Sequence, residues 1–237
     1  MSTTNSPRRE PLSLLELQDC ARRINTIFAQ RGVAFALMGG AGCCLLLDYY
    51  QVTTNRATTD LDMLMVPDKA QTPTLDAERL SKLLQKEHQD LIVTSIQEIT
   101  LYETPALQVY REPDPRPIIV DLEIFDSQAW PGRPQYDLTD PDNNTVSIPV
   151  GDGVEVLVMS PRWIVREKIL TAYGRKGGMK ERSDLEDVEA LLPLLNDHAL
   201  VFEKQDDIDA LKYVLKKDPE LEPDLRKKIK CPAVFEA

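Results

Sequence analysis

The pattern of apolar and polar residues changes along the chain, from short apolar runs separated by turns to longer stretches with helical spacing. Ser13 precedes apolar residues spaced three or four apart, which predicts a capped helix that ends at Gly32. Short apolar runs bounded by turn residues then predict strands. These predicted strands cover residues 33–38, 61–66, 91–99, 106–110, 117–125 and 154–160.

Further helices are predicted from capping residues. A short apolar helix is expected over residues 41–50, and Asp76 with Thr74 opens another that runs to about His88. Ser160 and Pro161 form a strong helix start, and the chain beyond them is predicted to be helical over residues 161–173, 183–195 and 206–216, with a short last helix after Pro219. The segment from Trp130 to Asn144 is rich in proline and aspartate and is predicted to be an irregular loop.

This order of elements predicts an α/β (α+β) protein, in which a mixed β-sheet flanked by helices is followed by a helical C-terminal half. We expect residues 1–12 to be a disordered tip, residues 13–159 to form the α/β core, and residues 160–237 to form a helical region packed on that core.

Composition narrows the class of function. The chain has 237 residues and a net charge of −11, so the molecule as a whole is not expected to attract DNA or another nucleic-acid backbone. No apolar run is long enough to span a bilayer, and the cysteines lack metal-type spacing, which favours a cytoplasmic protein with reduced thiols. The two histidines, His88 and His198, have no catalytic or zinc-binding neighbours in sequence.

Clustered acids are the main chemical signal. Asp60 and Asp62 begin an apolar run, and because side chains alternate along a strand, both should point to one face. Asp121 and Glu123 repeat this spacing in a later strand. Carboxylates held this close repel each other unless a cation lies between them, and Mg²⁺ or Mn²⁺ with phosphate would satisfy them. The alternative is that the acids are simply solvated at strand ends.

Two further features have a functional and a structural interpretation. Gly39 and Gly40 lie between a predicted strand and a helix, where backbone N–H groups favour phosphate, although such a pair is also common in packing turns. The segment from Gly174 to Arg182 is basic and follows Arg162, Arg166 and Lys168. It is either a phosphate-binding or RNA-binding cluster or a solvated turn.

The ordered motifs ALMGGAGCCLLL, NRATTDLDMLMV and PIIVDLEIF resemble the polymerase-beta-like nucleotidyltransferase superfamily. The form of the middle motif, from Arg56 to Asp62, is most similar to the AbiEii-type branch. Residues 154–192 are also similar to that branch, with a Glu-Lys pair in a helix, a basic loop and an acidic motif. The resemblance covers roughly residues 33–192.

The resemblance implies a metal-dependent transfer of a nucleoside monophosphate from an NTP such as ATP to a hydroxyl on an RNA, a protein or a small molecule, with release of pyrophosphate. It implies that the metal ligands and catalytic residues are Asp60, Asp62 and Asp121, and that the nucleotide contacts are Gly39, Gly40, Arg56, Thr58 and Lys168. No membrane partner is expected, because the longest apolar run is too short to span a bilayer.

Several alternatives stay open at the level of sequence. Glu123 competes with Asp121 as the third acid, Arg56 could instead serve in an ordinary ion pair, and Lys168 could be a solvated lysine beside a core face. Asp184 and Asp187 are expected at the start of a helix, with Asp184 pairing with Lys168 or Arg182. The segment between Gly40 and Asp60 is longer than in the family, so a non-catalytic binding or regulatory module is the main alternative function, and a metal-dependent phosphohydrolase is another.

Overall fold

The computed structural model describes residues 8–89, 92–96, 103–127, 138 and 144–236. The chain forms two compact units. The first consists of Met1–Leu45 and Asn55–Val158, and the second consists of Leu46–Thr54 and Met159–Ala237. Helix α2 (Gly39–Tyr49) begins in the first unit and ends in the second.

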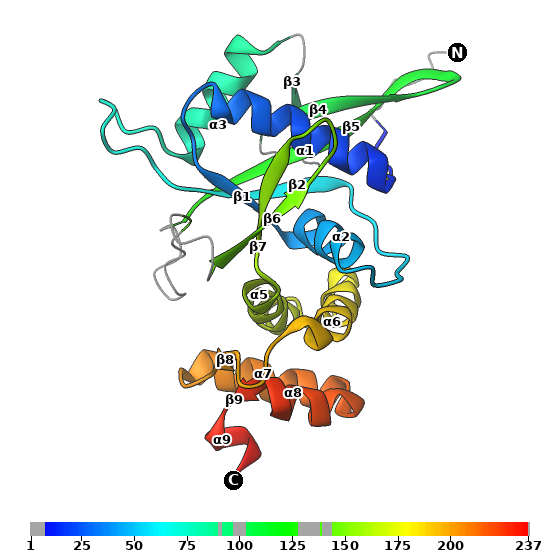
Figure 1. Cartoon of the computed structure of the whole chain (residues 1–237), viewed down its shortest axis with the longest axis vertical. Helices are drawn as coiled ribbons and strands as arrows, with labels where there is room; N and C mark the ends of the chain where they lie inside the picture. The colour runs from blue at the N-terminus through cyan, green and yellow to red at the C-terminus, as the bar shows by residue number, and fades with distance from the viewer. Residues whose placement is uncertain (1–7, 90–91, 97–102, 128–137, 139–143, 237) are drawn as a thin grey trace. The chain divides into compact units, whose positions relative to one another are not determined.

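A seven-stranded mixed sheet, in the order β3-β4-β5-β2-β1-β7-β6, forms the centre of the first unit. β1 pairs antiparallel with β2 and parallel with β7, while β5 pairs parallel with β2 and antiparallel with β4. This mixed α/β fold confirms the predicted fold class (Figure 1). The strands are β1 (Phe35–Met38), β2 (Asp60–Met65), β3 (Ile92–Ile96), β4 (Glu103–Arg111), β5 (Asp114–Asp126), β6 (Thr145–Pro149) and β7 (Glu155–Met159).

The first unit also contains two helices with side-chain caps (Figure 1), α1 (Leu14–Ala29) and α3 (Ala77–Glu87). In α1, the Ser13 hydroxyl accepts from the Glu16 N–H and the Glu16 carboxylate accepts from the Ser13 N–H, which confirms the predicted cap. In α3, Asp76 accepts from the N–H of Arg79, and the helix packs against β3, β4 and β5. Apolar residues such as Leu61 and Leu122 are fully buried and hold the centre of the sheet.

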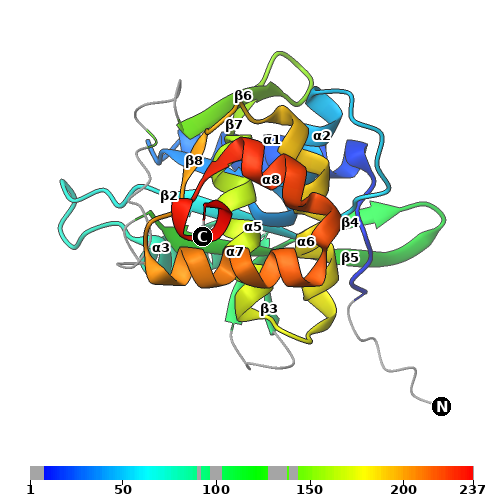
Figure 2. The ribbon, with the colours of Figure 1, turned by 90° about the horizontal axis from the view of Figure 1, so that it is seen from below.

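The second unit is mainly helical. α5 (Pro161–Gly174) packs against α6 (Met179–Leu191) and α7 (Gln205–Lys217), and Figure 2 shows α7 crossing α5. The remaining elements are the short helices η1 (Leu192–Leu194), η2 (Pro219–Leu221), α8 (Glu222–Lys228) and α9 (Pro232–Phe235), with the parallel strands β8 (Leu200–Val201) and β9 (Ile229–Lys230).

Several element boundaries differ from the expectation. The first apolar helix starts at Gly39 itself rather than after the glycine pair, and α6 starts at Met179 rather than at residue 183. β6 was not predicted, because its few residues carry only a weak alternation. Ser160 precedes α5 as predicted, but its side chain makes no capping hydrogen bond.

Three predictions fall wholly or partly on residues outside the described ranges, and one of them is the disordered tip, of which residues 1–7 lie outside. The loop from Trp130 to Asn144 lies outside them except for Leu138 and Asn144, and so does the end of the strand predicted at residues 91–99. Among the helices of the described residues, none combines the length and the apolarity needed to cross a membrane.

Candidate active site

Four acidic side chains share one face of the sheet where β2 begins. β2 and β5 are parallel neighbours, and their register places Asp60 opposite Asp121. The same register places Asp62 opposite Glu123. Because side chains alternate along a strand and opposite residues of neighbouring strands point the same way, all four carboxylates lie on one face. The predicted alternation is confirmed, and the register brings the two acidic pairs together.

Asp121 is the most buried of these acids, with 8% of its surface exposed. Its Oδ2 accepts a hydrogen bond from Nε of Arg9 at 3.2 Å. Its Oδ1 is buried and has no hydrogen-bond partner among the described residues. Since a buried acceptor without a partner is costly, a cation bound at this oxygen would lower the free energy.

Asp60 is oriented by a neighbouring hydroxyl. Oγ1 of Thr58 donates to Oδ1 of Asp60 at 2.7 Å, and Thr58 itself is only 6% exposed. The carbonyl oxygen of Thr58 accepts from the N–H of Leu12 at 2.8 Å. Thr58, predicted as a nucleotide contact, therefore acts in this structure on the Asp60 carboxylate.

Gly39 makes room for Asp62. Its φ of +59° is one that other residues adopt rarely, and a Cβ at this position would lie 1.8 Å from Oδ2 of Asp62. Any side chain at residue 39 would therefore push the Asp62 carboxylate away.

Gly40 has a similar relationship with the residues before β2. A Cβ on Gly40 would lie 2.8 Å from Oγ1 of Thr58 and 3.0 Å from Nη2 of Arg56. Arg56 itself donates to the carbonyl oxygen of Ala57. The glycine pair is thus packed directly against the acidic motif, which accounts for both glycines without requiring a phosphate.

The acids fit a divalent cation by donor type, since carboxylate oxygens are the ligands that Mg²⁺ and Mn²⁺ prefer. Within the part of the chain that the structure describes, no three Asp, Glu, His or Cys side chains are grouped closely enough to hold a metal ion. The unpartnered Oδ1 of Asp121 nevertheless offers an acceptor on the shared face. Holding one ion with three of these carboxylates would require the side chains to rotate toward a common point.

Lys168 lies in the second unit, where it forms a buried ion cluster. Its Nζ lies 2.9 Å from Oδ1 of Asp184 and 2.7 Å from Oδ2 of Asp187. Arg175 also pairs with Asp184, at 2.9 Å. Burial lowers the pKa of Lys168, but attraction to Asp187 and Asp184 outweighs burial, so that the pKa is raised. The alternative of a solvated lysine is wrong, because Lys168 is buried between two acidic partners. Its role in triphosphate binding stays a prediction.

The two acids of this cluster differ partly from expectation. The pairing of Asp184 with Lys168 is confirmed, whereas Arg182 pairs with Glu186 instead. The prediction that Asp184 and Asp187 open a helix was wrong, because both lie in the middle of α6 and are 1% exposed. They are held by a buried cation rather than by the helix dipole.

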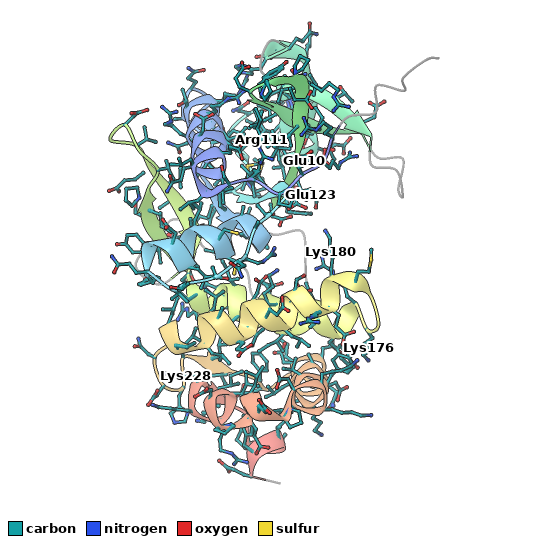
Figure 3. The ribbon with its side chains drawn as sticks, turned by 90° about the vertical axis from the view of Figure 1, so that its right-hand side faces the viewer. Glu10, Arg111, Glu123, Lys176, Lys180 and Lys228 are labelled. Atoms are coloured by element: carbon teal, nitrogen blue, oxygen red, sulfur yellow. The ribbon has the colours of Figure 1, made fainter. Side chains whose placement is uncertain are left out.

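The basic segment of the second unit is largely engaged with its own unit. Arg166 pairs with Asp207 at 2.8 Å, and Arg175 pairs with Asp184. Nζ of Lys176 lies 3.5 Å from the ring centroid of Tyr173. Figure 3 labels Lys176 and, on the first turn of α6, Lys180. These contacts favour the structural interpretation for Arg175 and Lys176.

The sequence pattern missed one residue that contacts the acids. Arg9 lies within the segment that was predicted to be a disordered tip, yet it contacts Asp121. Nothing in the sequence distinguishes Arg9 from its basic neighbour Arg8. Which of the two arginines contacts the acids depends on how the segment packs against the sheet.

Comparison with known proteins identifies relatives. The sequence matches the family model described as "Nucleotidyl transferase AbiEii toxin, Type IV TA system" over residues 27–232. The crystal structure of an antigenic nucleotidyltransferase-like protein from Paracoccidioides brasiliensis is similar, with a TM-score of 0.80 and 33% sequence identity, over 96% of this chain and 100% of that chain.

A more distant similarity supports the fold alone. The crystal structure of a putative nucleotidyltransferase from H. pylori has a TM-score of 0.51 and 16% identity, over 95% of this chain and 87% of that chain. No curated protein matches the sequence.

Proposed function

Since the chain belongs to the AbiEii family of nucleotidyltransferases, we propose that it transfers a nucleoside monophosphate from an NTP to a hydroxyl acceptor and releases pyrophosphate. The observation that supports this most is the register of β2 and β5, which places Asp60 opposite Asp121. Asp62 lies on the same face, in space that is available because residue 39 is glycine. Asp60, Asp62 and Asp121 would hold Mg²⁺ or Mn²⁺, with Asp121 preferred over Glu123 because of its buried, unpartnered oxygen.

In the proposed reaction, the acceptor oxygen attacks the α-phosphorus, and the bond from that phosphorus to the bridging oxygen breaks. Pyrophosphate leaves with the electron pair, and the hydroxyl proton moves to Asp121. A bound divalent cation would stabilise charge on the attacking and leaving oxygens. Thr58 keeps the Asp60 carboxylate in place, and the N–H groups at the start of α2, from Gly39 and Gly40, would contact phosphate.

The test is titration calorimetry of an NTP panel with and without Mg²⁺, together with an assay of pyrophosphate release. Asp60→Asn and Asp62→Asn keep the size of the side chain and remove the charge, so we expect each to abolish metal-dependent binding. Asp206→Asn removes one charge from an exposed position of α7 and serves as the control. If Asp60→Asn and Asp62→Asn both bind NTP with Mg²⁺ as tightly as the wild type does, the proposal is contradicted.

The products separate the competing functions. Pyrophosphate indicates nucleotidyl transfer, and free phosphate indicates a phosphohydrolase. Binding of NTP and metal with neither product, across RNA, protein and small-molecule acceptors, would indicate a non-catalytic binding module.

A further inference from the structure

Residues 8–12, which we call the N-terminal arm, dock beside β5 in the first unit. Arg8 forms a parallel bridge with Ile118, and the N–H of Ile119 donates to the carbonyl oxygen of Arg8 at 2.8 Å. β2 pairs with β5 only from Asp121 onward, so the arm takes up a backbone donor that β2 does not reach. At its other end, the N–H of Leu12 donates to Thr58.

Charged side chains fasten the arm on both sides of Arg9. Arg8 pairs with Asp114 at 2.5 Å, and Arg111 of β4 pairs with Glu10 at 3.0 Å and with Glu16 at 2.6 Å. Figure 3 labels Glu10 and Arg111, together with Glu123 of the acidic face. Each partly exposed pair contributes little alone, but a network with a buried anchor, Leu12, can hold a short segment.

The docked arm places the Arg9 guanidinium on the acidic face, which is the sheet face that carries Asp60, Asp62, Asp121 and Glu123. The Arg9 side chain is 30% exposed and the Asp121 side chain is 11% exposed, with 3.2 Å between Nε and Oδ2. A guanidinium on that carboxylate opposes a divalent cation there in two ways. It occupies Oδ2, which leaves only Oδ1 of Asp121 for the ion, and its positive charge repels the ion.

We propose that Arg9 is a built-in counter-ion of the acidic face, which divalent cations displace from Asp121. This inference rests on the proposed function, because it assumes that Asp121 is a metal ligand. Arm docking and metal binding then oppose each other, and by reciprocity each weakens the other by the same factor. The arm regulates the site by setting how much free Mg²⁺ or Mn²⁺ is needed to occupy it.

Metal affinity of the full chain provides the first test, with Mn²⁺ as the probe in titration calorimetry. Arg9→Ala is expected to bind Mn²⁺ about tenfold more tightly than wild type, because a repelling charge close to the ion is lost. Arg9→Lys keeps the charge, and Arg22→Ala removes an equal charge from α1, where Arg22 pairs with Asp19 and Asp152. The Mn²⁺ affinity of both variants is expected to stay within about twofold of wild type. The lysine variant retains the repelling charge, and salt screens the exposed charge that Arg22→Ala removes.

Trypsin cleavage after Arg9, followed by mass spectrometry without added metal, provides the second test. Asp121→Asn removes the partner charge, so cleavage is expected to be severalfold faster than in wild type, whereas Asp206→Asn, at an exposed position of α7, is expected to leave the rate unchanged. Added Mn²⁺ is expected to speed cleavage in the wild type and not in Asp121→Asn.

The outcomes separate the two proposals. Mn²⁺ binding that Asp60→Asn abolishes but Arg9→Ala leaves unchanged or weakened overturns only the role of Arg9, as do equal cleavage rates for wild type and Asp121→Asn. If neither wild type nor Arg9→Ala binds Mn²⁺, the metal dependence of the proposed function fails as well.

Discussion

Gly39 and Asp62 are packed so closely that a Cβ on residue 39 would lie 1.8 Å from Oδ2 of Asp62. The cause lies in the sheet, where the preceding residue, Met38, is paired opposite Asp62 across the antiparallel strands β1 and β2. The glycine turn and the acidic motif are therefore one structural unit, although they lie apart in the sequence. A change in either is expected to disturb the other.

Gly39→Ala is expected to lower the free energy of unfolding by about 3 kcal/mol, because it adds backbone strain at positive φ to a clash with Asp62. Gly32→Ala is the matched control, since Gly32 has a φ of +64° but no atom within 4 Å of a Cβ. That control should lose only about 1 kcal/mol, the cost of the left-handed backbone. Urea denaturation measures both, and equal losses would show that the contact with Asp62 is unimportant.

Thr58→Val is expected to weaken Mn²⁺ binding about tenfold, as is typical when a group that orients a metal ligand is lost. Valine keeps the shape of threonine but cannot donate to Asp60, whereas Thr58→Ser keeps the hydroxyl that makes the 2.7 Å hydrogen bond. Titration calorimetry of both variants separates the hydrogen bond from packing. Equal weakening in the serine variant would attribute the effect to the lost methyl group.

Lys168→Met is expected to lower the free energy of unfolding by about 3 to 5 kcal/mol at pH 7, because two buried carboxylates lose their shared cation. The pKa of Lys168 is raised in the folded chain. Its stabilisation is therefore complete below the unfolded pKa of about 10.4 and is lost as the pH rises through the folded pKa.

Denaturation at several pH values checks this, with Lys180→Met as the control at an exposed position of α6. We expect the wild type and Lys168→Met to converge only in strongly alkaline solution. Convergence between pH 5 and 8 would contradict the assignment of the stabilising charge to Lys168.

Glu16 is expected to stabilise the fold through its pairing with Arg111. Hydrogen bonds from Arg111 lower the pKa of Glu16 from 4.5 to about 2, against the opposing effect of burial. A lowered pKa means that the stabilisation is present above about 4.5 and is lost as the pH falls toward 2. Glu16→Gln should therefore cost about 1 kcal/mol near pH 7, a value reduced for solvent screening, and progressively less in acid.

Denaturation curves of wild type and Glu16→Gln between pH 7 and acid measure this difference. Glu78→Gln in α3 is a suitable control, since Glu78 forms an exposed ion pair with Lys82. A difference that grows as the pH falls would have the wrong sign for a carboxylate with a lowered pKa.

Much of the local structure followed from neighbouring residues alone. The Ser13 cap, the strand that carries Asp60 and Asp62, and the shared face of those two acids depend on backbone geometry and on side chains a few residues away. The start of α6 was predicted too late because Asp184 and Asp187 were taken as acids of the first helical turn. They lie in the middle of the helix, where the buried Lys168 of α5 pairs with both. The sequence pattern offered only the helix dipole to explain them.

The sequence by itself determined the class of the fold, the family and the acidic motif, because periodicity and motif order are local properties. Only the tertiary structure decided that Asp60 lies opposite Asp121, that Lys168 is held by Asp184 and Asp187, and that Arg9 reaches the acidic face. Each of these relationships joins residues far apart in the chain. Strand register, helix packing and the docking of the N-terminal arm create them, and no local pattern of residues specifies which distant partners will meet.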